Sequence, residues 1–229
     1  MKHILCYLVL ASGLLLGGRQ IYNGIHEIAA KDRYVSVRGL SERTVTADKV
    51  TWPLSFNVVG NDMMALYNDL DAKQKSIIAF LKSNGLGDDE IFLSAASVND
   101  RLANQWGNQD VRFRYQTSAT ITVISRDVER VRGIMLKQSD LIRQGVAVEG
   151  NDYATRYEYT SLNDLKPEMV EEATRNARAV ARKFAADAEC DLGSIRQASQ
   201  GYFSVENADE NTPHLKKVRV VTTVEYFLD

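Results

Sequence analysis

Histidines are the side chains best suited to acid–base catalysis near neutral pH, and this 229-residue chain holds His3, His26 and His214. A nucleophilic enzyme needs a histidine placed beside an activated serine or cysteine. Neither His26 nor His214 neighbours a nucleophile motif such as G-x-S-x-G. Two convergent histidines are also too few for a histidine-based zinc centre, and the phosphate-binding patterns G-x-x-x-x-G-K-[ST] and G-x-G-x-x-G do not occur. The sequence therefore predicts no catalytic residue, no metal site and no cofactor, and favours a protein that is not an enzyme.

Two acidic clusters are the remaining candidates for chemistry. One is Asp88-Asp89-Glu90, and the other joins Glu206 with Asp209 and Glu210. Their spacing does not match a calcium-binding loop, so we interpret both as solvated loop charge. A hydrolase built on carboxylates from distant parts of the chain stays open, without a motif in its favour.

Aromatic side chains give the one candidate binding surface. Tyr153, Tyr157 and Tyr159 fall on one side of a strand predicted over residues 146–161, and Trp106 stands at a predicted hairpin tip. Tyrosines at this spacing can line the floor of a groove that binds a peptide, a lipid or a small molecule. Cross-strand packing explains the same pattern without a ligand, and we favour it.

Net charge and cysteine content exclude other classes of protein. The formal net charge is -2, whereas a nucleic-acid binder normally carries a clear basic excess. The chain holds two cysteines, Cys6 and Cys190, the first of them in a predicted targeting segment. A disulfide framework and a four-thiolate zinc site are therefore excluded.

The N-terminal segment, residues 1–30, predicts export. A basic start at Lys2 precedes an apolar run from Ile4 to Leu16, and no small-x-small cleavage site stands at its end. We therefore expect a hydrophobic helix that acts as a signal anchor, attaching the protein to a membrane, with a cleaved signal peptide as the alternative. Lys2 favours leaving this end in the cytoplasm, which places residues 31–229 outside.

Hydrophobic periodicity divides the body into strands and three helices. The predicted strands cover residues 34–40, 44–59, 91–100, 111–123, 146–161, 194–205 and 215–228. The predicted helices run over 61–85 and 127–144 and from Pro167, which suits a first helical position. No linker rich in Pro, Gly or Ser divides this body. The order predicts an α+β fold, an antiparallel sheet of hairpin–helix units with the three helices mainly on one face.

The last predicted strand, residues 215–228, organises the rest of the chain. Its residues are mostly β-branched or aromatic, and both of its faces carry apolar side chains. We therefore place it inside a sheet rather than at an edge.

Several of these segments resemble SIMPL-domain proteins of bacteria. The similarity lies in the opening strand Y-V-S-V-R-G-L-S-E-R from Tyr34, the turn G-L-G-D-D-E-I from Gly85, the helix start K-P-E-M from Lys166 and the ending K-K-V-R-V-V-T-T-V-E-Y from Lys216. The ending is similar to that of a subgroup with an N-terminal signal anchor. The resemblance covers residues 34–229 and includes the periplasmic immunogenic proteins of Gram-negative bacteria.

The resemblance implies an α+β fold, a location in the cell envelope and a tendency to form ring-like oligomers. It implies no accepted enzymatic activity. We therefore expect a self-assembling structural or stress-related protein, anchored at the periplasmic side of the inner membrane or cleaved and soluble in the periplasm. The alternative function is a periplasmic binding module.

Overall fold

The computed structural model describes residues 13, 17–21, 33–103, 112–149 and 154–229. Most of the predicted N-terminal hydrophobic helix lies outside these residues, so that prediction stays untested. Within them, no helix is both long enough and apolar enough to cross a membrane.

The chain folds into two compact units. Unit 1 comprises residues 1–43, 162–205 and 217–229, and unit 2 comprises residues 44–161 and 206–216. Three strands, β1 (Tyr34–Thr46), β9 (Ser204–Asn207) and β10 (Leu215–Leu228), contribute residues to both units. The predicted α+β class with antiparallel pairing is confirmed. The prediction of a single sheet with three helices is wrong, because the described residues form two sheets and four α-helices.

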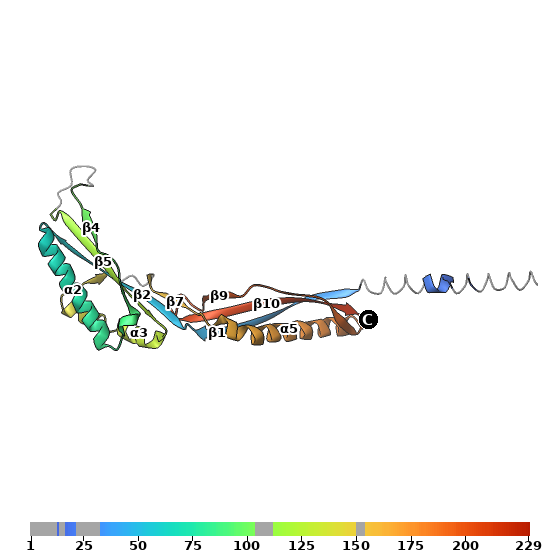
Figure 1. Cartoon of the computed structure of the whole chain (residues 1–229). Helices are drawn as coiled ribbons and strands as arrows, with labels where there is room; N and C mark the ends of the chain where they lie inside the picture. Colours follow the sequence, from blue (N-terminus) through green and yellow to red (C-terminus); the bar gives the residue numbers. More distant parts are fainter. Residues whose placement is uncertain (1–12, 14–16, 22–32, 104–111, 150–153) are drawn as a thin grey trace, which may run out of the picture. The chain divides into compact units, whose positions relative to one another are not determined.

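Unit 2 is built around a six-stranded sheet, which we call sheet B. Its strands are β2 (Lys49–Gly60), β3 (Ile91–Leu93), β4 (Ser97–Asp100), β5 (Tyr115–Ser125), β6 (Val148–Glu149) and β7 (Arg156–Glu158). Strands β2 and β5 form the antiparallel centre, β3 and β4 both pair with β5, and β6 and β7 both pair with β2. One face of sheet B is covered by α2 (Met63–Ser83), α3 (Val128–Met135) and α4 (Ser139–Arg143), which share one hydrophobic core with it (Figure 1).

Helix α2 begins and ends where the sequence predicts. The carboxylate of Asp62 accepts hydrogen bonds from the backbone N–H groups of Met64 and Ala65, which have no partner within the helix. After Ser83 the chain turns at Gly85, whose φ of 94° is in the left-handed region that glycine favours. The short 3₁₀-helix η1 (Asp88–Glu90) then leads into β3.

The helix predicted over 127–144 is two helices, and the reason is local geometry. Between α3 and α4 the backbone N–H groups of Lys137 and Gln138 bond to carbonyls three residues back rather than four. This tightening changes the helical phase. As a result Leu141 is buried while Ile142, which the sequence pattern places inside, is exposed.

The strand predicted over 146–161 is also interrupted. Strand β6 pairs with Ser55 and Phe56 of β2, and β7 pairs with residues 49–51, so the two pairings flank Pro53. Proline lacks the N–H that a ladder on this side of β2 needs.

Unit 1 is a four-stranded antiparallel sheet, sheet A, packed against one long helix. The sheet has the order β1-β10-β8, with β8 spanning Leu192–Gln200, and β9 (Ser204–Asn207) also pairs with β10. The prediction that residues 215–228 lie inside a sheet is confirmed. The break predicted in the first strand at residues 41–43 is wrong, since β1 continues to Thr46.

Helix α5 (Leu162–Asp187) covers one face of sheet A and begins five residues before the predicted start at Pro167. The two residues before it, Thr160 and Ser161, donate their backbone N–H groups to the carboxylate of Asp48, which holds the chain in place for an earlier start. Its buried residues are Met169, Ala173, Ala177, Ala181 and Ala185. Val180 and Phe184, which the helical hydrophobic pattern would place inside, are exposed.

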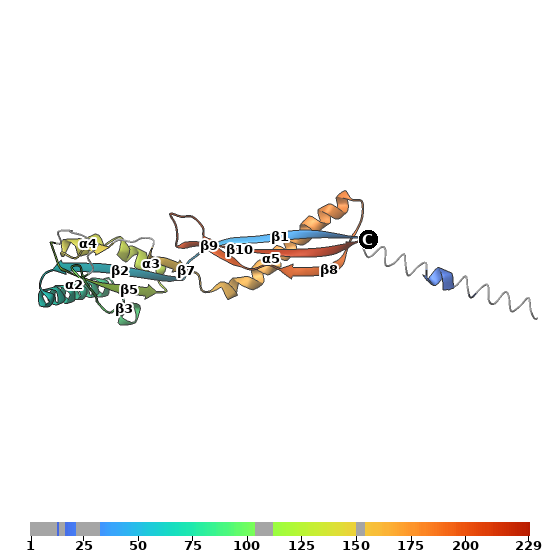
Figure 2. The same ribbon diagram turned by 90° about the horizontal axis from the view of Figure 1, so that it is seen from above.

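The four-residue spacing of these buried side chains makes the contact face rotate along α5, because four residues exceed one 3.6-residue turn. This rotation lets the helix cross the strands of sheet A obliquely (Figure 2). Small alanines bring the helix backbone close to the strands beneath.

Candidate functional site at the sheet edges

The predicted aromatic surface is only partly within the described residues. Tyr157 packs into unit 2: its hydroxyl donates to the sulfur of Met135 at 3.6 Å, and its ring meets that of His214 edge-on at 6.2 Å between centroids. Tyr159 is half-buried two residues further along the chain. Tyr153 and Trp106 lie outside the described residues, so a binding surface made of these four aromatics stays a prediction.

His214 is held in a setting that disfavours its charged form. Partial burial and the nearby positive charge of Arg132 lower the pKa of His214, and Glu129 opposes them. Its backbone carbonyl accepts a hydrogen bond from the N–H of Ala47 at 2.8 Å. Because the ring packs on Tyr157, this histidine joins the 206–216 loop to the body of unit 2.

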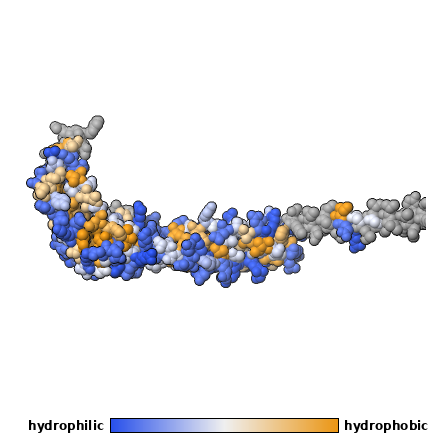
Figure 3. Space-filling model, viewed as in Figure 1, coloured by the Kyte–Doolittle hydropathy of each residue, from blue (hydrophilic) through white to orange (hydrophobic). Residues whose placement is uncertain are grey.

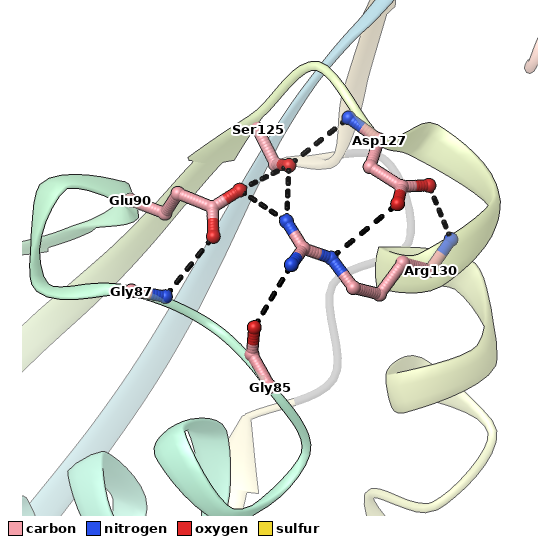
Figure 4. A network of polar contacts seen from close by, with 6 residues as sticks. All are labelled: Gly85, Gly87, Glu90, Ser125, Asp127 and Arg130. Atoms are coloured by element: carbon pink, nitrogen blue, oxygen red, sulfur yellow. Dashed lines mark hydrogen bonds and ion pairs between the residues drawn. The ribbon is translucent and has the colours of Figure 1, made fainter.

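A polar network of six residues in unit 2 surrounds Glu90 (Figure 4). Its carboxylate accepts hydrogen bonds from the hydroxyl of Ser125, the guanidinium of Arg130 and the backbone N–H of Gly87. Partial burial acts to raise the pKa of Glu90, but these hydrogen bonds and the charge of Arg130 outweigh it, so the pKa lies below its usual value. The interpretation of this acid as solvated loop charge is therefore wrong.

The other members of the network show that it is structural. Arg130 also donates to the carbonyl of Gly85, and the hydroxyl of Ser125 accepts from the N–H of Asp127. The serine hydroxyl is thus engaged as both donor and acceptor, and the acid is ionised. The network ties the turn after α2 to the end of β5 and the start of α3. In the part of the chain that the structure describes, no three His, Cys, Asp or Glu side chains gather in a way that could hold a metal ion.

The edges of the two sheets offer a different kind of site, because an edge strand presents unpaired backbone N–H and C=O groups to a partner. Proteins usually protect such edges with charged side chains, prolines or a covering element. The four edges of sheets A and B differ in how they are covered and charged.

Two edges are protected. At the β1 edge of sheet A, the strand carries the charged residues Arg38, Glu42 and Arg43, and the side-chain amide of Asn176 on α5 donates to the carbonyl of Leu40 at 2.9 Å. At the β6–β7 edge of sheet B the strands have two and three residues, and they carry Glu149, Arg156 and Glu158. Short, charged strands of this kind resist pairing with another chain.

Strand β8 forms an unprotected edge of sheet A. Residues 194–200 are exposed on both faces, and most of them have small or uncharged side chains. The one charged residue of the strand, Arg196, is neutralised by Glu225 at 3.2 Å and stacks over the ring of Tyr34. Just beyond the strand, the side chain of Tyr202 is 100% exposed.

Residues 91–99 form an edge of sheet B at which no other described strand pairs. They span β3, the link 94–96 and most of β4, and contain no charged residue and no proline. Phe92, Leu93 and Val98 are exposed. Hydrophobic residues lie among hydrophilic ones on the face of each unit shown in Figure 3. We call this segment the 91–99 edge.

Sequence reasoning could not identify these edges, because the order of strands in a sheet is not visible in hydrophobic periodicity. One signal was present: nine consecutive uncharged residues at 91–99 in a chain of which 25% is charged.

Comparison with known proteins places the chain in a family without giving it an activity. No curated protein matches it. Residues 35–226 match the SIMPL family, described as a protein of unknown function (DUF541). The match covers most of the chain and confirms the resemblance seen in its strands and turns, so this chain belongs to the SIMPL family.

Proposed function

We propose that this protein is a non-enzymatic component of the cell envelope that assembles with copies of itself, in a structural or stress-related role. The proposed location is the periplasmic side of the inner membrane, with the N-terminal segment as anchor. The basic start and apolar run of residues 1–30 support export, and the SIMPL family, whose function is unknown, is consistent with an envelope protein.

The observation that carries the proposal is the open edge of β8. Two antiparallel copies of this strand could pair about a two-fold axis and join two copies of sheet A into one continuous sheet. Small side chains such as Ser194, Ala198 and Ser199 would let the two backbones approach, and the exposed ring of Tyr202 would add contact area beside the pair. Arg196 would bring no uncompensated charge, since Glu225 already neutralises it.

A charge substitution on this edge tests the proposal. Ala198→Lys places a positive charge on β8, and pairing about a two-fold axis brings two such charges into one interface, where they repel. The matched control is Ala179→Lys on the exposed side of α5 in the same unit. The full chain is studied in lipid nanodiscs or detergent micelles, and its mass is measured by light scattering corrected for the lipid or detergent.

We expect the unmodified chain and the Ala179→Lys variant to form the same discrete oligomer. The Ala198→Lys variant should dissociate at a protein concentration at least tenfold higher, with an unchanged unfolding temperature. A monomeric unmodified chain would reject self-assembly altogether. An oligomer that Ala198→Lys leaves intact would reject β8 as the pairing strand.

A further inference from the structure

The hydrophobic core of unit 2 is incompletely covered at the 91–99 edge. Leu93 pairs with Ile121 and Val98 pairs with Thr117, and directly paired residues of neighbouring strands point to the same face of a sheet. Ile121 and Thr117 are buried, whereas Leu93 is 54% and Val98 51% exposed. The helix-covered face of sheet B therefore ends, on this side, in two half-exposed apolar side chains.

The opposite face of the same edge is also apolar at its outermost strand. Phe92 pairs with Thr122 on the uncovered face of the sheet and is exposed. An additional strand laid along this edge would thus find apolar neighbours on both of its faces. It would also lie along an edge backbone where residues 91–98 carry no charge and no proline.

We infer that the 91–99 edge binds extended segments of non-native polypeptide chains, taking them up as a transient extra strand of sheet B. Backbone hydrogen bonds supply affinity that does not depend on sequence, and side chains at alternate positions supply preference. Here the preference is for apolar residues that extend the core next to Leu93 and Val98. Folded proteins bury such segments, so unfolded or partly folded chains are the partners that expose them.

The geometry of the edge argues against a second copy of this chain as the occupant. Strands β3 and β4 have three and four residues, and residues 94–96 separate them. Ser94 is already bonded within sheet B: its N–H donates to the carbonyl of Thr120, and its hydroxyl oxygen accepts from the N–H of Thr120. A stable interface buries roughly 1,200 Å² or more, and two strands of three and four residues with a break between them offer a second copy only a short ladder. It suits a partner that binds briefly and adapts its register.

The test uses a permanently unfolded probe, fluorescein-labelled reduced and carboxymethylated α-lactalbumin. Binding to the full chain in lipid nanodiscs is followed by fluorescence anisotropy, with empty nanodiscs as the blank and native α-lactalbumin as the folded competitor. The test variant carries Leu93→Lys and Val98→Lys together. The control variant carries Met64→Lys and Ile142→Lys, which add the same charge at apolar residues of the same unit that are 71% and 65% exposed.

We expect the unmodified chain and the control variant to bind the unfolded probe with Kd values within twofold of each other. The test variant should bind it at least tenfold more weakly, and native α-lactalbumin should not compete. Equal binding by the test variant, or an equal loss in the control variant, would overturn the proposal. If the double substitution lowers the unfolding temperature, the single variant Ala96→Lys, at an exposed small residue of the same edge, takes its place under the same criteria.

Two further outcomes separate this proposal from self-assembly. The Ala198→Lys variant should keep full affinity for the probe, because β8 belongs to the other sheet. If it loses the probe instead, non-native chains bind at β8 and the 91–99 edge is not the site. If the Leu93 and Val98 substitutions lower the mass of the oligomer while probe binding persists, the edge is a contact between copies and the inference is wrong.

Discussion

Gly39 of β1 lies directly under the backbone of Ala173 in α5. A Cβ atom built on Gly39 would stand 1.8 Å from the carbonyl oxygen of Ala173 and 2.5 Å from the backbone nitrogen of Ala177. Both obstacles are helix backbone, which cannot rotate away as a side chain can. Residue 39 therefore has to be glycine for α5 to pack on sheet A at its present distance.

Gly39→Ala should destabilise unit 1 strongly, because α5 must lift off the sheet to admit one methyl group. We expect a loss of about 3 kcal/mol or more in the free energy of unfolding, at the upper end of the cost of overpacking a core. Denaturant unfolding followed by circular dichroism measures it.

The matched control is Gly133→Ala in α3, where a Cβ would meet no atom within 4 Å. Alanine is the better helix former, so this variant should gain about 0.5–1 kcal/mol. Equal and small effects at the two glycines would contradict the close packing of α5.

The lowered pKa of Glu90 predicts that the folding stability of the chain depends on pH. Its pKa is lower in the folded chain than its usual value of 4.5, so the folded state favours the ionised form. The stabilisation is complete above pH 4.5 and is lost as the pH falls through the lower, folded-state pKa. Glu90→Gln removes the charge while keeping the size, and it should cost about 2 kcal/mol at pH 7, as for a hydrogen bond to a charged group.

The measurement is the difference in unfolding free energy between the unmodified chain and Glu90→Gln as a function of pH. This difference should begin to shrink below pH 4.5, where Glu90 becomes neutral in the unfolded chain, and shrink further below the folded-state pKa, where it is neutral in both states. A difference that stays constant down to pH 3 would show that the charge of Glu90 does not stabilise unit 2.

His214 predicts a second pH dependence of folding stability. Stability again falls as the pH falls, but in a higher pH range. Burial and Arg132 lower its folded-state pKa below the usual 6.5, so the unfolded chain takes up the proton first. The stabilisation is therefore present above pH 6.5 and is lost as the pH falls toward the folded-state pKa. His214→Phe keeps a ring against Tyr157 and removes the titration.

Thermal unfolding at pH 7 and pH 5.5 compares the two proteins. The unfolding temperature of the unmodified chain should drop more between these two pH values than that of His214→Phe. Identical drops would assign the pH dependence to other groups.

Local chemistry accounts for the elements that the sequence predicts well. Asp62 and Gly85 mark the ends of α2 because a cap and a left-handed turn act within a few residues. The period-two pattern of residues 215–228 likewise places β10 at its exact bounds, and its two partly apolar faces correctly indicate a central strand. The family could also be predicted, since its motifs are such strand and turn patterns.

The departures arise where a distant group decides a local structure. Pro167 is a good helix start in isolation, but Asp48 holds Thr160 and Ser161, and α5 begins earlier. Ile142 fits a regular helical pattern, yet the tightened turn between α3 and α4 buries Leu141 instead.

The sequence by itself determined the α+β class, most strands, the two ends of α2, the family and the lack of a recognisable catalytic motif, because these depend on residue types at short spacing. Only the tertiary structure decided that the strands divide into two sheets and that β8 and residues 91–99 lie at their open edges. Strand order follows from contacts between residues far apart in the chain. Whether Leu93 and Val98 are covered likewise depends on which element lies beside them.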